Sequence, residues 1–158
     1  MSFIKALFGK QGEPSLKEPK YINNADSAKV AHILKLFGEN LGRLNIMSII
    51  ANSAEIIKYG ESAISPLRQT LLKDEKWEMR AIAAKCLRDI GSKTAVPALL
   101  LALSDKEDQV RQPVIGALGA LADSRAEQPL VKLLQDKSEI VRQEAQEALK
   151  KIRSANPT

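Results

Sequence analysis

The 158-residue sequence has little of the residue types on which extracellular and many catalytic proteins depend. It contains one cysteine and one histidine, and only 4% of its residues are aromatic. The single cysteine excludes an internal disulfide framework and cannot by itself supply a cysteine metal cluster. We therefore expect a protein of the reducing cytoplasm that has no metal site and no cofactor.

Long hydrophobic runs are also missing. No apolar stretch approaches the roughly 20 residues that are needed to cross a bilayer. The first ten residues hold an apolar run that is too short for a signal-peptide core, without a small-residue cleavage pattern. These features predict a soluble, cytoplasmic protein.

The excess of positive charge lies at the two ends of the sequence. The formal net charge is +5, yet residues 26–149 carry 17 basic and 17 acidic side chains. A protein that holds phosphates along its length needs a basic stripe through its body, because each neutralised phosphate needs a nearby cation. The neutral body therefore argues against a nucleic acid as the partner.

The sequence repeats itself with a period of 31 residues. Five positions in the period keep the same or a similar residue over three successive units, which composition alone does not explain. These positions are Leu72, Leu103 and Leu134; Asp74, Asp105 and Asp136; Arg80, Arg111 and Arg142; Leu87, Leu118 and Leu149; and Ile90, Leu121 and Ile152.

Within each unit the apolar spacing is helical. In the first of the three units, Met79, Ala83, Cys86, Leu87 and Ile90 lie on one stripe of a helix, and the next two units match it. Shorter helices are expected at about 95–103 and 126–134, each with a proline early in its first turn, where a missing N–H group is tolerated. The sequence therefore predicts an all-α fold, a right-handed α-solenoid of about four helix hairpins.

This period also predicts how the chain is organised. The repeat domain spans residues 26–153, with units at about 26–60, 61–91, 92–122 and 123–153, and a tail at 154–158 follows it. Residues 9–25 have the composition of a linker. Residues 1–8 are amphipathic and could touch a membrane surface or a partner, but we favour a segment that caps the first unit or stays disordered.

Each unit carries an aspartate and, six residues later, an arginine. The pairs are Asp74 and Arg80, Asp105 and Arg111, and Asp136 and Arg142. The aspartate is expected in the turn between the two helices, where its carboxylate can accept backbone N–H bonds, and the arginine one turn into the second helix, within reach of a turn carboxylate. Stacked units would align these pairs into a structural ladder.

The segment from Asp105 to Arg111, followed by Gly116 to Leu121, resembles a HEAT repeat of the phycobilisome-lyase-like subtype. The segment from Asp136 to Arg142 is the next best copy, and the resemblance covers residues 61–153 well and 26–60 poorly. It implies a stack of helices that binds proteins. The bilin lyases that give the subtype its name act as paired subunits and present an open-chain tetrapyrrole to a cysteine of a phycobiliprotein.

The first unit departs from the pattern. Arg43 and Ile49 stand 31 residues before Asp74 and Arg80, so the ladder pair is missing there. Helices are expected at about 27–37 and 44–59, separated by Gly38 and Gly42.

The second of these helices carries a wide isoleucine face. Either the period slips by one or two residues and this face is core, which we favour, or part of it is an exposed docking patch. The residues are Ile46, Ile49, Ile50, Ile56 and Ile57.

No catalytic residue is predicted. His32 lies between apolar neighbours and is expected to be structural, and Cys86 shares a core position with Ala117 and Ala148. No strand is followed by a glycine-rich phosphate loop, and paired His-Glu metal motifs are absent from the sequence.

The outward positions of the second helices predict a partner-binding surface, with Trp77 as its large aromatic anchor. Gly116 and Gly119 would let a partner approach the backbone, or would instead ease the packing of helices. The predicted surface consists of Trp77, Ala81, Lys85, Arg88, Gln112, Gly116, Gly119, Gln143 and Lys150.

Two functions remain after these steps. The first is a non-catalytic scaffold, adaptor or assembly factor that binds an unidentified protein in the groove of the stack. The alternative, which rests on the resemblance, is a bilin lyase subunit or a chaperone that handles the chromophore of a phycobiliprotein.

Overall fold

The computed structural model describes residues 23–43 and 46–157, and for Ile46 the backbone alone. The amphipathic segment predicted at residues 1–8 and most of the linker predicted at 9–25 lie outside this range. The described part consists of eight α-helices joined by turns and short 3-10 helices, without strands. This confirms the all-α prediction.

Four helix hairpins follow one another along the chain. The first helices of the hairpins are α2 (Asn24–Asn40), α4 (Ile64–Lys73), α6 (Val96–Ala102) and α8 (Glu127–Leu133). The second helices are α3 (Ile46–Ile57), α5 (Trp77–Ile90), α7 (Asp108–Leu121) and α9 (Glu139–Ala155). Short 3-10 helices lie at Leu41–Arg43, Gly60–Ala63, Lys93–Ala95 and Ser124–Ala126.

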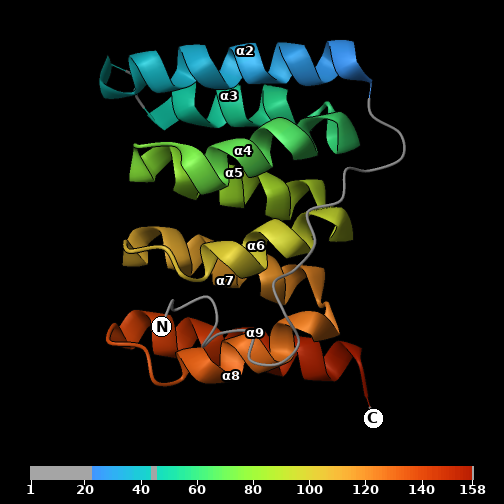
Figure 1. The fold of residues 1–158 in the computed structure, drawn as a ribbon, viewed down its shortest axis with the longest axis vertical. Coiled ribbons are helices and arrows are strands. Elements are labelled where there is room, and N and C mark those ends of the chain that lie inside the picture. Colours follow the sequence, from blue (N-terminus) through green and yellow to red (C-terminus); the bar gives the residue numbers. More distant parts are fainter. Residues whose placement is uncertain (1–22, 44–45, 158) are drawn as a thin grey trace.

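The hairpins are stacked one upon another in chain order, from α2 and α3 at one end to α8 and α9 at the other (Figure 1). The second helices form one layer, in which α3 packs on α5, α5 on α7 and α7 on α9. The first helices form the other layer, in which α4 packs on both α2 and α6. The turns between the two helices of each hairpin therefore recur along one edge of the stack.

The 31-residue period extends into the first hairpin. Helices α3, α5, α7 and α9 begin at residues 46, 77, 108 and 139, so the starting points are equally spaced. The slip that we considered for this unit does not occur. What makes the first unit different is α2, whose 17 residues run through Gly38 instead of ending before it.

The isoleucines of α3 are divided between the core and the surface. Ile56 is fully buried at the position of Leu87, while Ile49 and Ile57 are partly buried against the core. Ile50, however, is 56% exposed. The core interpretation of this face is therefore confirmed for Ile56 and wrong for Ile50, because α3 packs on α5 and no other helix of the described ranges covers its opposite side.

Helix ends are fixed by local backbone chemistry. Gly91 terminates α5 in a left-handed conformation with φ of 75°, and Ala122 terminates α7 at the equivalent position with φ of 48°. Glycine adopts this conformation without cost, whereas alanine is strained by its Cβ atom. Pro97 lies in the first turn of α6, as predicted, and α7 continues through Pro113.

Candidate functional site

Aspartates shape the turns along one edge of the stack. In each of three turns, the aspartate Oδ1 accepts the backbone N–H of the residue two positions further on. These distances are 2.9 Å from Lys76 to Asp74, 3.0 Å from Glu107 to Asp105 and 2.8 Å from Ser138 to Asp136. The three carboxylates are therefore held in the same way by their own turns.

The arginines connect successive turns. Arg80 Nη1 donates to the backbone carbonyls of Asp74 and Glu75 at 2.9 and 3.1 Å. Its Nε and Nη2 atoms donate to the two carboxylate oxygens of Asp105 in the next unit, at 2.7 and 2.9 Å. The hydrogen bond to Asp105 raises the pKa of Arg80.

Arg111 joins its own turn to the next one in a similar way, but with one hydrogen bond to the next aspartate instead of two. Its Nη1 atom donates to the carbonyl of Asp105 at 2.9 Å, and its Nη2 atom donates to the carboxylate of Asp136 at 2.9 Å. The side chains of Arg111 and Asp136 are 4% and 9% exposed, so the pair is almost dry. The predicted ladder is therefore present, but each ion pair between an arginine and an aspartate carboxylate joins two successive units. Within one unit the arginine binds the backbone of the turn.

Both ends of this ladder are incomplete. Arg142 donates to the carbonyls of Asp136 and Lys137, but no later aspartate faces it in the described chain. At the other end, the carboxylate of Asp74 accepts a hydrogen bond only from the backbone of Lys76 among the described residues. Ile49 stands where an arginine would be needed to reach Asp74.

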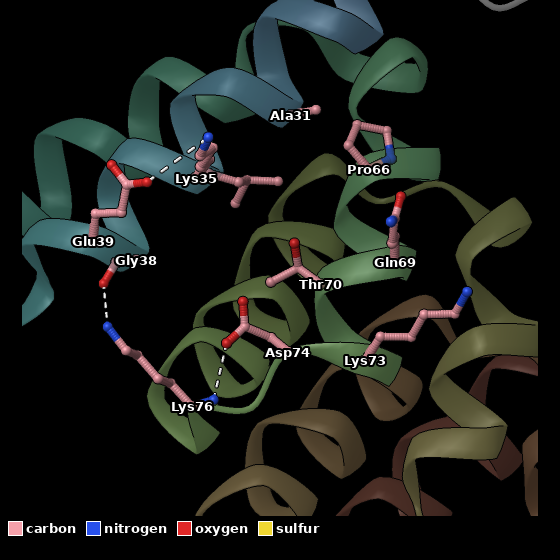
Figure 2. Close-up of a pocket in the computed structure, with 11 residues that line it drawn as sticks. Ala31, Lys35, Gly38, Glu39, Pro66, Gln69, Thr70, Lys73, Asp74 and Lys76 are labelled. Carbon is pink, nitrogen blue, oxygen red and sulfur yellow. Dashed lines mark hydrogen bonds and ion pairs between the residues drawn. The ribbon is translucent and has the colours of Figure 1, made fainter.

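A pocket opens at the incomplete end, next to Asp74. It has a volume of about 450 Å³ and lies between α2, α4 and the turn before α5 (Figure 2). Leu34 and Pro66 contribute buried apolar surface to it. Glu39 and Asp74 bring carboxylates, and the lysines of the pocket are Lys35, Lys73 and Lys76. Sequence reasoning missed this pocket, although the isoleucine at an arginine position of the period was a usable signal.

The predicted partner-binding residues lie along α5, α7 and α9, and most of them are accessible. Trp77 is 40% exposed. Gln112 and Gly116 are half-buried. The exposed members of the set are Lys85, Arg88, Gln143 and Lys150.

Two predicted members of this surface are buried instead, namely Ala81 and Gly119. A Cβ atom added to Gly119 would lie 2.9 Å from the Cβ atom of Ala148, closer than side chains tolerate. Gly119 therefore allows α7 and α9 to approach each other, which is the packing role that we considered for it. Gly116 has open space around it, since nothing lies within 4 Å of such an atom.

Exposed apolar residues also lie on this side of α3 and α9. Met47 and Ile140 are 69% and 53% exposed and occupy the same position of the period on α3 and α9. Ile50 stands on α3 at the position of Ala81 and Gln112. Extending the 31-residue period into α3 would have placed both Met47 and Ile50 at outward positions from the sequence alone.

Groups that could perform chemistry are scarce. Burial raises the pKa of the Cys86 thiol to about 11, so it is protonated near neutral pH. His32, which we expected to be a structural residue and not a ligand, is exposed on α2. In the described ranges, no three side chains among His, Cys, Asp and Glu come close enough to hold a metal ion.

Comparison with known proteins agrees with this architecture. The sequence pattern of HEAT repeats matches residues 64–150. The chain belongs to the HEAT-repeat family. The matched region covers most of the last three hairpins and contains all three aspartate and arginine pairs of the ladder.

A curated relative of this HEAT-repeat protein is the bilin biosynthesis protein PecE of Mastigocladus laminosus. The two are 45% identical over 60 residues, which is 37% of this chain and 22% of the relative. The chain thus spans about a fifth of the length of the relative that it matches. The relation is consistent with the phycobilisome-lyase-like subtype of HEAT repeat. As regards membranes, none of the helices described here is long and apolar enough to span one.

Proposed function

We propose that this HEAT-repeat protein binds a phycobiliprotein and assists in handling its bilin chromophore, as a lyase subunit or as a chaperone. The observation that carries the proposal is the 60-residue stretch that is 45% identical to a bilin biosynthesis protein. This relation favours our alternative prediction over a general adaptor. The same surface would serve either function, and the identity of the partner distinguishes them.

The second helices provide the binding surface in this proposal. They form a continuous layer, in which α5 packs on α7 and α7 on α9. Side chains on such packed helices lose little freedom when a partner binds, which favours recognition of a folded protein. Trp77, exposed at the start of α5, would supply the aromatic anchor.

The charges of this surface suit acidic groups. Lys85, Arg88 and Lys150 are exposed on α5 and α9. They could pair with carboxylates of the partner or with the propionate groups of a bilin. Arg88 also contacts the neighbouring Asp89 at 2.8 Å, so its guanidinium is already partly compensated. Lys85 and Lys150 are therefore the better candidates for long-range attraction.

The chain itself would not carry the chromophore covalently. Its single cysteine, Cys86, is 1% exposed and its pKa is raised to about 11, so a thiolate is neither formed nor accessible near pH 7. In this proposal the chromophore is attached to a cysteine of the phycobiliprotein. The contribution of this chain is binding and orientation.

Calorimetric titration of the full chain with a purified phycobiliprotein subunit, with and without its bilin, tests the proposal. The unchanged chain is expected to bind, and the double variant Lys85→Glu and Lys150→Glu to bind at least about tenfold more weakly, because two positive charges of the surface become negative. Lys106→Glu with Lys137→Glu is the matched control, since it changes the charge equally at the turn edge, and it should bind as the unchanged chain does.

The outcomes separate the two functions. Loss of binding in the surface variant alone supports both the partner and the surface. Equal weakening by the two double variants would mean that net charge, and not this surface, governs the binding. No binding of the subunit in either form would overturn the phycobiliprotein proposal and return the adaptor function, with another partner, to first place.

A further inference from the structure

The ladder of aspartates and arginines offers an internal template for its own open end. Asp105 and Asp136 each bind a guanidinium from the preceding unit, at 2.7 to 2.9 Å. Asp74 is the equivalent residue in the turn between α4 and α5, and its Oδ1 accepts the equivalent backbone hydrogen bond, from Lys76, at 2.9 Å. Its carboxylate is therefore oriented as in the two turns that bind an arginine. At the position of the period where that arginine would stand, the chain has Ile49, whose side chain has no hydrogen-bond donor.

The space beside Asp74 remains open. The pocket of about 450 Å³ lies there, and in Figure 2 the Asp74 side chain extends toward it from the turn after α4. Leu34 and Pro66 are buried apolar residues of its lining and fit the methylene stem of a long side chain. The pocket therefore combines an apolar part with a carboxylate that has acceptor capacity left.

The lysines of the pocket are directed to other groups. Lys76 Nζ donates to the carbonyl of Gly38, and Lys35 Nζ lies 3.9 Å from the carboxylate of Glu39. The Lys73 side chain extends away from Asp74 in Figure 2. None of these ammonium groups forms an ion pair with the Asp74 carboxylate in the part of the chain that the structure describes.

We propose that this pocket binds a guanidinium group, namely an arginine side chain presented by a partner protein, with Asp74 as its carboxylate ligand. The partner arginine would take the place that Arg80 and Arg111 occupy at Asp105 and Asp136. A planar fork matches a carboxylate better than a lysine ammonium does, because it donates two parallel hydrogen bonds. The proposal is independent of the phycobiliprotein function, since it names a side chain and not a partner.

A titration of the full chain followed by ¹H–¹⁵N correlation spectra tests the site. The probes are N-acetyl-arginine methylamide, its neutral citrulline isostere and the corresponding lysine compound. The arginine compound should shift the amide signals of Thr70, Asp74 and Lys76, with half-saturation on the order of 1 to 10 mM for so small a ligand. The citrulline and lysine compounds should bind at least about fivefold more weakly.

Two variants and a control assign the response to the carboxylate. Asp74→Asn keeps the oxygen that accepts the turn hydrogen bond and removes the charge, and it should weaken binding at least about fivefold. Glu75→Gln removes the adjacent exposed charge and should leave binding unchanged. Ile49→Arg restores the arginine of the period, so its own guanidinium should fill the site and abolish the response.

Several results would overturn the proposal. They are equal binding of the arginine and citrulline compounds, binding of the lysine compound as tight as that of arginine, or an unchanged response in Asp74→Asn. A pocket that responds to propionate but not to the arginine compound would show that its lysines bind anions instead. If Ile49→Arg fails to fold, the comparison of Asp74→Asn with Glu75→Gln decides alone.

Discussion

The contact between Arg80 and Asp105 makes the most specific energetic prediction. Their side chains are 8% and 10% exposed, and two hydrogen bonds of 2.7 and 2.9 Å join them. Asp105→Ala removes both bonds and leaves a largely dry guanidinium without its counter-charge. Breaking such a pair from one side costs about 3 to 5 kcal/mol, and we expect the lower value because the pair lies at the edge of the stack.

The open end of the ladder provides the matched comparison. Asp74→Ala removes the equivalent carboxylate, which accepts one backbone N–H bond and no arginine. Loss of that single bond should lower the free energy of unfolding by about 0.5 to 1.5 kcal/mol. The two substitutions change the same residue type at the same position of the period, so their difference of about 2 kcal/mol isolates the link between units.

Urea unfolding followed by far-UV circular dichroism measures both values. The slope of the free energy against urea should be unchanged, so that the midpoints report stability. A double-mutant cycle with Arg80→Met should yield a coupling of at least about 1.5 kcal/mol with Asp105→Ala and almost none with Asp74→Ala. Equal losses for the two aspartates, or no coupling between Arg80 and Asp105, would refute the inter-unit ladder.

Three further predictions concern a helix end, an ion pair and the thiol. Ala122→Gly should raise the free energy of unfolding by about 1 kcal/mol in thermal or urea unfolding, because it relieves the left-handed alanine, and Gly91→Ala should lower it by a similar amount. Hydrogen bonds from Arg125 hold the pKa of Asp123 in the folded chain below its usual value. The stabilisation that they provide is therefore present at pH values above the pKa of the unfolded chain, about 3.9, and is lost as the pH falls through the lower pKa of the folded chain. Asp123→Asn should therefore be less stable than the unchanged chain near pH 7 and converge with it in acid, and a constant gap would contradict the assignment. Cys86 should react with a thiol reagent at pH 8 at least about a hundredfold faster in denaturant than in the folded chain, whereas equal rates would show that it is accessible.

The 31-residue period predicted most of the fold from the sequence. Helices expected at 95–103 and 126–134 lie at Val96–Ala102 and Glu127–Leu133, each preceded by a short 3-10 helix. Repeated leucines and small residues at fixed spacing allow little other than stacked hairpins, because each hairpin can bury its apolar faces only against its neighbours. That is why the later units were easier to predict than the first.

The direction of the ladder could not be predicted from the spacing. In a tandem array, Arg80 is six residues from Asp74 and 25 residues from Asp105, and both lie in turns on the same edge. Only the stacking distance of the units decides which carboxylate the guanidinium reaches. The pocket at Asp74 is lined by residues of α2 and α4 as well as by the turn, so it too lay beyond sequence reasoning, although Ile49 marked the position.

The exposure of the residues in the proposed partner surface was predicted in part. Lys85, Arg88 and Lys150 are exposed as expected, since charged residues on the outer side of a helix seldom face anything but water. Gly119 is buried because glycine at this position lets the backbones of two helices meet. A small residue in a helix is compatible with close packing and with an open surface, and the sequence does not distinguish the two.

Sedimentation velocity of the full chain mixed with a bilin and a chromophore-free phycobiliprotein subunit tests the proposed function most directly. Absorbance in the bilin band reports the chromophore, and absorbance at 280 nm reports the proteins. The account predicts a complex that contains both proteins, sediments faster than either alone and carries the bilin absorbance with it. Separate sedimentation of the two proteins, both with and without the bilin, would contradict it.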